Sequence, residues 1–525
     1  MKNITIFTWG LILLCGLACF GFFQLAYSYH LLYREQTSLF TYTLLQLLSY
    51  IEKPAVLSCL SGDFLLQFFH YNGAGAAIIT SLLLLLGGTG YWVFRVWVKP
   101  WIALVGGVIM IGWEGARLCS LTYPLSSTVS LIGGLFLFLL FKQLRGKRAL
   151  LCGGMIGVVL SYVLFGYGVF VFLFFACLLV VAPMKQYLVA GLMLVAGMAL
   201  PACLSNTYLL TLPQAYQYPA TEWWSKPDLM HERLLGMNIE LHAANWEKVI
   251  QLAQPDMRMS LTSVCSNLAH AMQGDLSGRL MNQYQPAGLG LFIPIDESST
   301  YFSTQLANEV WFHLGDMTMA EHAAMLSMIF SPQHKGARMV QRLAEINLIN
   351  GDEVAAKKYL KTLSRTLAYK QWAKDRMPGE QTSEVKQWLN WKRTFLPEKD
   401  TLRVSSLDVA KSLRLLLEAN AENRMARDYL LCFHLLMKDL PAFTKDYQQF
   451  YHEKPSRLYA EALLIQLMKK QAMGEEVKKT GMSPEVVIDF NEYNRLHNQF
   501  GGHPDALSGQ FGKTYWFYYH YAQFQ

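Results

Sequence analysis

The spacing of apolar residues changes once along the chain, near residue 210. Before this point, stretches of about 20 apolar residues alternate with short polar segments, and each is long enough to cross the roughly 30 Å hydrocarbon core as a helix. After it, charged residues return and apolar residues recur at helical spacing. The pattern predicts an all-α protein with about seven transmembrane helices followed by a soluble helical domain. The expected transmembrane helices are 4–26, 75–95, 98–118, 125–143, 149–165, 167–184 and 186–208.

The fifth and sixth expected helices come from one apolar stretch. As a single helix it would be about 50 Å long at 1.5 Å per residue, which is too long for a bilayer. Gly166-Tyr167-Gly168 lies in its middle and offers a tight turn. We therefore expect a transmembrane domain over 1–208, an aromatic connector over 209–228 and a helical domain over 229–525.

Basic residues predict the orientation. Most Lys and Arg residues between the apolar stretches follow the second, fourth and sixth of them: Arg95, Lys99, Lys142, Arg145, Lys147, Arg148 and Lys185. Because positive charge is retained on the cytoplasmic side, the N-terminus is expected inside the cell. The first apolar stretch is too long for a signal peptide and is interpreted as a retained anchor. With seven crossings, the C-terminal domain is expected in the periplasm of a Gram-negative cell, with the helices in its inner membrane.

The loop 28–73 is expected to form two helical pieces that are broken at Lys53-Pro54. Leucine and phenylalanine recur in both pieces at helical spacing, which favours helices lying in the membrane interface. The alternative is a loop that packs on the protein surface.

The C-terminal domain shows helix–turn–helix spacing with similar turns. Gly-Asp pairs occur at Gly274-Asp275, Gly315-Asp316 and Gly351-Asp352, and each follows an apolar helical pattern. The spacing resembles that of tetratricopeptide-like (TPR-like) repeats, although the signature is degenerate. Such repeats present a concave surface, usually to a protein partner. The alternative is an irregular helical domain.

The last fifteen residues, 511–525, include eight aromatic residues. An exposed surface of that kind would promote aggregation, so we expect these side chains to cap the last helices or to rest on the membrane.

Composition excludes several classes of function. The net charge of +7 owes much to the expected cytoplasmic loops and does not imply nucleic acid binding. The nine cysteines include no zinc spacing, and the two in the C-terminal domain, Cys265 and Cys432, are expected to be buried thiols rather than a disulfide. Gly512-Lys513-Thr514 is no phosphate loop, because the first glycine of that motif is replaced by Leu507. The scattered histidines, among them His242 and His313, are expected to fill helix surfaces rather than to bind metal.

Polar residues near the outer ends of the expected transmembrane helices are the candidates for chemistry. Ionisable groups at membrane depth are costly and usually face a cavity or a partner. Glu114 stands out because apolar residues run up to it, although Glu114 and Arg117 are also spaced as a structural pair one turn apart. The candidates are Arg34, Glu35, Gln36, Asp63, Gln67, His70, Trp113, Glu114 and Arg117.

The whole chain resembles an uncharacterised family of Gram-negative inner-membrane proteins with a polytopic N-terminal half, a helical C-terminal half and an aromatic terminus. The resemblance is carried by Arg34-Glu35-Gln36, by the run from Gly62 to Phe69 and by the run from Gly512 to Tyr519. It implies an architecture but no activity.

The transmembrane half is also similar to the C-type glycosyltransferases, which use polyprenyl-phosphate sugar donors. The resemblance implies that Glu35 is a catalytic base or holds a divalent metal, with Glu114 or Asp63 as a second carboxylate. Arg117 would then bind a phosphate. The remaining polar candidates, Arg34, Gln36, Gln67, His70 and Trp113, would bind substrate. The alternative is a non-enzymatic membrane scaffold whose helical repeats recruit envelope proteins.

Overall fold

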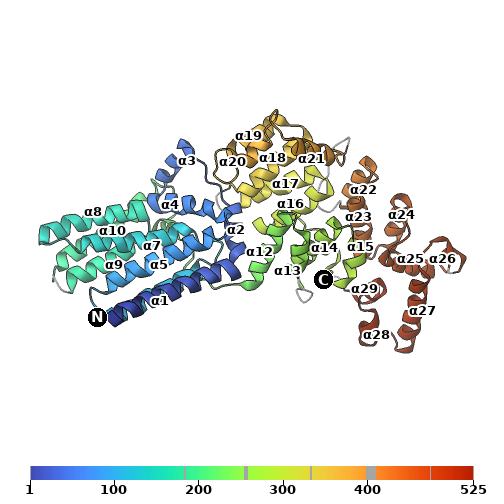
Figure 1. The fold of residues 1–525 in the computed structure, drawn as a ribbon, viewed down its shortest axis with the longest axis horizontal. Coiled ribbons are helices and arrows are strands. Elements are labelled where there is room, and N and C mark those ends of the chain that lie inside the picture. The colour runs from blue at the N-terminus through green and yellow to red at the C-terminus, as the bar shows by residue number, and fades with distance from the viewer. Residues whose placement is uncertain are drawn as a thin grey trace. The chain divides into compact units, whose positions relative to one another are not determined.

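The computed structural model describes residues 2–182, 185–220, 222–253, 258–331, 334–397, 409–472 and 474–523. Within these ranges every regular element is a helix or helical turn, as expected for an all-α protein. The chain divides into two compact units (Figure 1). Unit 1 comprises residues 1–232, 335–338 and 361–374, and unit 2 comprises 233–334, 339–360 and 375–525.

Unit 1 contains the apolar helices and the short helices of the loop 28–73. They are α1 (Lys2–Gly21), η1 (Phe22–Ala26), α2 (Ser28–Gln36), α3 (Leu44–Ser49), η2 (Tyr50–Glu52), α4 (Val56–Leu66), η3 (Gln67–His70), α5 (Ala74–Phe94), α6 (Pro100–Arg117), α7 (Leu125–Phe141), α8 (Lys147–Phe165), α9 (Gly168–Val181), α10 (Tyr187–Ser205) and α11 (Leu212–Gln217).

The expected number of seven transmembrane helices was too high. By length and composition, three described helices, α5, α8 and α10, can cross a membrane. A fourth candidate is the pair Gly10–Ala26 and Ser28–Gln36, which bends by 70°. The helices α7, with 17 residues, and α9, with 14, are apolar but short. For α7, α9 and α10 the expected stretches, 125–143, 167–184 and 186–208, are longer than the helices that form.

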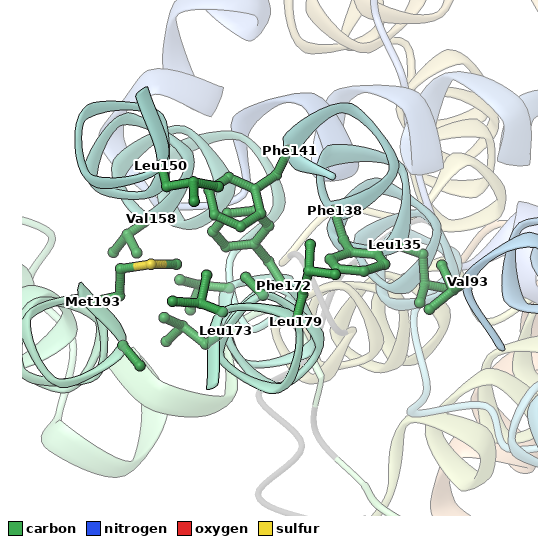
Figure 2. Packing of buried hydrophobic residues seen from close by; sticks show 14 of the residues in the cluster. Val93, Leu135, Phe138, Phe141, Leu150, Val158, Phe172, Leu173, Leu179 and Met193 are labelled. Atoms are coloured by element: carbon green, nitrogen blue, oxygen red, sulfur yellow. The ribbon is translucent and has the colours of Figure 1, made fainter. Parts of the chain in front are cut away.

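A core of aliphatic and aromatic side chains joins α5, α7, α8, α9 and α10 (Figure 2). Phe138 of α7 and Phe172 of α9 are fully buried in it, together with Met193 of α10. The opposite faces of the same helices expose large apolar side chains, such as Phe174 at 65% and Val195 at 68%. Helices that are apolar on both faces are typical of membrane proteins.

Small residues bring these helices close together. A Cβ atom at Gly134 of α7 would collide with the carbonyl oxygen of Gly168 in α9, and one at Gly107 of α6 would lie 2.7 Å from that of Gly87 in α5. Such contacts between backbones are typical of helix pairs in membranes. The expected break in the stretch 149–184 is confirmed, since Gly166 separates α8 from α9 with a φ of +56°.

The loop 28–73 begins with α2, a helix that the sequence did not predict, and then forms the two expected helical pieces. The first is α3 with η2 and the second is α4 with η3, and Lys53, Pro54 and Ala55 separate them. No residue of α3 is buried, and Leu44 and Leu45 are 72% and 81% exposed. This apolar surface is consistent with the expected position in the membrane interface.

Unit 2 is built from short helices. Some of these helices have part of their residues in unit 1. The helices of unit 2 are α12 (Leu229–His242), α13 (Trp246–Leu252), α14 (Ser260–Met272), α15 (Leu276–Arg279), η4 (Leu280–Asn282), η5 (Ala287–Gly290), α16 (Tyr301–Leu314), α17 (Met317–Phe330), α18 (Ala337–Asn350), α19 (Glu353–Leu363), α20 (Lys370–Asp375), α21 (Ser383–Arg393), α22 (Val409–Ala419), α23 (Arg424–Leu436), α24 (Leu440–Phe450), α25 (Arg457–Lys469), α26 (Glu475–Lys479), α27 (Pro484–Gln499), α28 (Pro504–Phe511) and α29 (Tyr515–Tyr521).

The Gly-Asp pairs join consecutive helices, as the sequence predicted. Gly315 ends α16 with a φ of +100°, a conformation that glycine adopts without steric cost. Asp316 then begins α17 by accepting a hydrogen bond from the backbone N–H of Met319 at 3.1 Å. Gly351-Asp352 does the same between α18 and α19. These turns make helical hairpins.

The aromatic C-terminus packs on the last helices, so the expected cap is confirmed for its described residues. Tyr515 and Trp516 are fully buried. The hydroxyl of Tyr515 donates to the carbonyl of Leu435 at 3.0 Å, and the indole N–H of Trp516 donates to the carbonyl of Glu461 at 3.0 Å. Phe524 lies outside the described residues.

Candidate functional site

Glu35 lies in the last turn of α2 and is 4% exposed. The hydroxyl of Tyr369 donates to its Oε2 at 2.7 Å, and Nδ1 of His70 lies 3.8 Å from the same oxygen. Tyr369 is 334 residues away in the sequence, and no pattern in the sequence pointed to it. Glu35 and His70, both candidates from the sequence, are therefore brought together by a third residue that sequence reasoning missed.

The environment of His70 differs from that of Glu35. The side chain of His70 is 41% exposed, whereas that of Glu35 is buried. The nearby carboxylate of Glu35 raises the pKa of His70 above its usual value. A carboxylate with an imidazole and a phenol beside it is suited to accepting and passing a proton.

The space beside Glu35 is small. The cavity that it lines together with Gln67, Phe40 and Tyr369 has a volume of about 10 Å³. This is about the room that one water molecule requires. Gln67 is held in place, since its Oε1 accepts from the hydroxyl of Tyr42 at 3.0 Å. A sugar does not fit here in the described conformation.

The residues before and after Glu35 in the sequence contact other parts of unit 1. Arg34 donates to the carbonyl of Tyr123 at 2.8 Å, in the connection between α6 and α7. The side-chain oxygen of Gln36 accepts a long hydrogen bond of 3.4 Å from Arg338. The three consecutive polar residues thus take part in three separate sets of contacts.

Glu114 is enclosed by donors. Its Oε1 accepts from the hydroxyls of Tyr123 at 2.8 Å and Thr128 at 2.5 Å, and its Oε2 accepts from Arg117 at 3.2 Å. The guanidinium of Arg117 also lies 4.2 Å from the ring centroid of Tyr123. Glu114 and Arg117 form the structural pair that their spacing allowed. Trp113, one residue earlier, is 52% exposed.

Asp63 belongs to a third network. Its Oδ2 accepts from the hydroxyl of Tyr50 at 2.8 Å, and that hydroxyl also receives the amide of Gln46 at 3.2 Å. Lys335 donates to the side-chain oxygen of Gln46 at 2.7 Å. The three candidate carboxylates, Glu35, Asp63 and Glu114, therefore have no hydrogen-bond partner in common among the described contacts. Within the described residues, no group of three or more His, Cys, Asp or Glu is placed to hold a metal ion.

A large cavity lies in unit 2 and has a volume of about 1140 Å³. Its lining includes Phe292 and Trp311, and the terminal helix α29 contributes Phe517, Tyr518 and Tyr521. The part of the lining that the structure describes includes two cationic side chains, Arg258 and Lys513, and no acidic one. The rest of the lining is Ser260, Met281, Asn282, Gln283, Tyr284, Gln285, Pro286, Ala287, Gly288, Leu289, Ile293, Pro294, Val409, Phe433, Met437, Gly512, Ala522 and Gln523.

Sequence reasoning did not find this cavity, because its walls come from segments that lie far apart in the chain. The one available signal was the run from Gly512 to Tyr519, whose residues Gly512, Lys513, Phe517 and Tyr518 line it.

Comparison with known proteins identifies the family. The model of a family of unknown function (DUF6057) matches residues 2–522. The chain belongs to this family. Nothing among the curated proteins or the solved structures matches it. The match supports the expected membership of an uncharacterised family, and it supports neither the similarity to C-type glycosyltransferases nor the TPR-like character of unit 2.

This member of DUF6057 also has a buried charge network in unit 2. Glu309 of α16 is fully buried, and its Oε2 receives a hydrogen bond of 2.6 Å from Arg342 of α18. Nδ1 of His242 lies 2.9 Å from Oε1 of Glu309, and Arg342 also binds Glu345 at 3.0 Å. Lys392 is buried nearby, and burial lowers its pKa to about 7. His242, which was expected to fill a helix surface, is part of a buried charge network that the sequence did not reveal.

Proposed function

We propose that this protein is a membrane-anchored binding protein, in which the apolar helices of unit 1 hold a helical domain that recruits a protein partner. The observation that carries the proposal is the cavity of about 1140 Å³ in unit 2. This volume is just above the range of about 300–1,000 Å³ that is usual for small-molecule sites, so the cavity has room for a peptide segment of a partner. The proposal corresponds to the scaffold alternative raised from the sequence.

The contrast with unit 1 supports binding over catalysis. A glycosyltransferase needs a donor and an acceptor within hydrogen-bond reach of the catalytic group. The cavity at Glu35 holds about 10 Å³, and Glu114 is already occupied by three donors. Most of the polar candidates of unit 1 thus already have hydrogen-bond partners within the unit.

We place the protein in the bacterial inner membrane with its N-terminus in the cytoplasm and unit 2, as a TPR-like domain, in the periplasm. Basic residues support this orientation. Arg95 and Lys99 follow α5, the run from Lys142 to Arg148 follows α7, and Lys185 follows α9. Positive charge in connections between apolar helices is typical of the cytoplasmic side, so we place these three connections inside the cell.

Photo-crosslinking of the full-length protein in its native cells tests the proposal. We expect p-benzoyl-phenylalanine at Tyr284, which is 40% exposed in the cavity, to give a discrete adduct with a protein. The same residue at Val354, which is 82% exposed outside the cavity, is the matched control and should give none. Mass spectrometry of the purified adduct identifies what is bound. Equal labelling at both positions, or none at Tyr284, contradicts a binding role for the cavity.

The glycosyltransferase remains a second candidate because of one arrangement, the contact of Glu35 with Tyr369 and His70. In this reaction Glu35 would take the proton of the acceptor hydroxyl while the sugar leaves its polyprenyl phosphate. The cavity beside Glu35 would have to open before a donor lipid could enter.

Glu35→Gln tests this candidate. The change keeps the size and polarity of the side chain and removes the carboxylate, so transfer from a radiolabelled polyprenyl-phosphate hexose is expected to fall by about 100-fold or more. Glu353→Gln, at an exposed position of unit 2, should leave transfer unchanged. Purified wild-type protein without any transfer activity, or a Glu35→Gln variant with full activity, removes the enzymatic reading.

A further inference from the structure

We infer that the cavity of unit 2 takes an acidic peptide segment that carries apolar side chains. This inference rests on the proposed binding function and states the chemistry of the partner. It follows from the charge of the cavity, from its apolar lining residues and from the hydrogen bonds that fix one segment of its lining.

The charge of the cavity favours an anionic ligand. Arg258 and Lys513 are its two charged lining residues within the described part of the chain, and both are exposed. Lys513 directly precedes α29, which Thr514 begins by accepting a hydrogen bond from the backbone N–H of Phe517 at 3.3 Å. Cations that line a concave surface concentrate ligands of opposite charge and repel basic ones.

The apolar lining favours a ligand with apolar side chains. Leu289 and Met437 line the cavity and are 45% and 44% exposed, so each has a large surface to cover. Methionine adapts its shape to different partners. Phe292 and Trp311 are only 6% and 2% exposed, so the open aromatic surface comes mainly from Tyr284, which is 40% exposed. These features give a peptide with apolar side chains several surfaces to cover.

The wall of the cavity is built before any ligand arrives. The amide of Asn267 donates to Gln285 at 3.0 Å and to the carbonyl of Gly290 at 2.8 Å. Its oxygen accepts from Gln283 at 2.8 Å. The segment from Gln283 to Gly290 is thus tied to α14, and a preorganised wall reduces the entropy that binding would otherwise cost. Asn282 and Gln523 remain at the surface, where they can bond to a peptide backbone.

Fluorescence anisotropy with the full-length protein in detergent tests the inference. The probes are three fluorescein-labelled peptides with leucine and phenylalanine at alternate positions, and with glutamate, glutamine or lysine at the others. We expect the glutamate peptide to bind at least about tenfold more tightly than the glutamine peptide, with an affinity that falls as salt rises. The lysine peptide should bind most weakly.

Charge reversal locates the binding. The double change Arg258→Glu and Lys513→Glu is expected to remove the preference for the glutamate peptide. Lys386→Glu, at an exposed lysine of α21 outside the cavity, is the control and should not alter it. Circular dichroism checks that each variant keeps its helices.

The outcomes separate the two proposals. An adduct with a protein at Tyr284 in cells, combined with equal binding of all three peptides, overturns the acidic peptide while the binding function stands. An adduct with a lipid or a sugar polymer at Tyr284 also overturns it. No adduct and no peptide binding contradict both proposals. A preference for glutamate that the double change abolishes supports both.

Discussion

Replacing Arg342 with methionine is expected to destabilise unit 2 by about 3–5 kcal/mol, because the change leaves carboxylates buried without their cation. Arg342 binds Glu309 at 2.6 Å and Glu345 at 3.0 Å, and its own side chain is 4% exposed. Its guanidinium also lies 3.6 Å from the ring centroid of Phe312, a contact that methionine keeps only in part. Hydrogen exchange of α16 and α18 in the full-length protein measures the loss.

The control is Arg495→Met. Arg495 pairs with Glu492 at 2.7 Å, but the two side chains are 59% and 38% exposed. Exposed pairs contribute about 0–1 kcal/mol, so this change should have little effect on exchange. Equal effects of the two changes would show that the buried Arg342 network contributes no more to stability than an exposed ion pair.

The loss in Arg342→Met should depend on pH. Burial already raises the pKa of Glu345, with Arg342 opposing the shift, so removing Arg342 raises it further. A carboxyl group whose pKa is higher in the folded than in the unfolded protein stabilises less as pH rises above the unfolded value of about 4.5. The difference from wild type, compared at the same pH, should therefore be smaller at pH 5 than at pH 8. A difference that grows toward pH 5 contradicts this assignment.

Trp516→Ala is expected to lower the free energy of unfolding by about 3–5 kcal/mol and to loosen the packing of the C-terminal cap. Trp516 is fully buried, and its ring centroid lies 5.2 Å from that of Phe490 and 5.7 Å from that of Tyr493. The same helix carries Phe517, Tyr518 and Tyr521 into the cavity. Binding of the glutamate peptide should therefore be lost together with protection of α29 in hydrogen exchange.

Two further variants separate the contributions of Trp516. Trp516→Phe keeps an aromatic ring but removes the N–H that donates to the carbonyl of Glu461 at 3.0 Å. Trp516→Phe should lower the free energy of unfolding by about 1–3 kcal/mol, because a buried carbonyl loses this donor. Trp391→Ala, at a position that is 49% exposed, should cost less than about 1 kcal/mol. Peptide binding that survives Trp516→Ala would show that α29 does not shape the cavity.

The candidate site was predictable only in part. The sequence singled out Glu35, Asp63, His70, Glu114 and Arg117 because charge in apolar surroundings is costly and visible in a pattern. The sequence did not show which of these residues contact one another. Glu114 and Arg117 are three residues apart on one helix, so that pair followed from helix geometry. Glu35 meets Tyr369 across 334 residues, a contact that no local spacing encodes.

The sequence by itself determined the features that depend on neighbouring residues. Hydrophobicity separated the apolar half from the charged half, and Gly166 marked the end of α8. Glycine followed by aspartate predicted the hairpin turns, because an αL residue ends one helix and an aspartate begins the next. These effects act within a few residues and leave a local pattern.

Tertiary structure decided the rest. How far each apolar helix extends depends on where its neighbours allow a turn, so the expected seven transmembrane helices reduce to three or four candidates. The cavity forms where α29, α23 and the segment 281–294 meet, and the buried network forms where α12, α16 and α18 meet. Both depend on packing between segments that are distant in the chain, and packing of that kind depends on the volumes and shapes of many side chains at once.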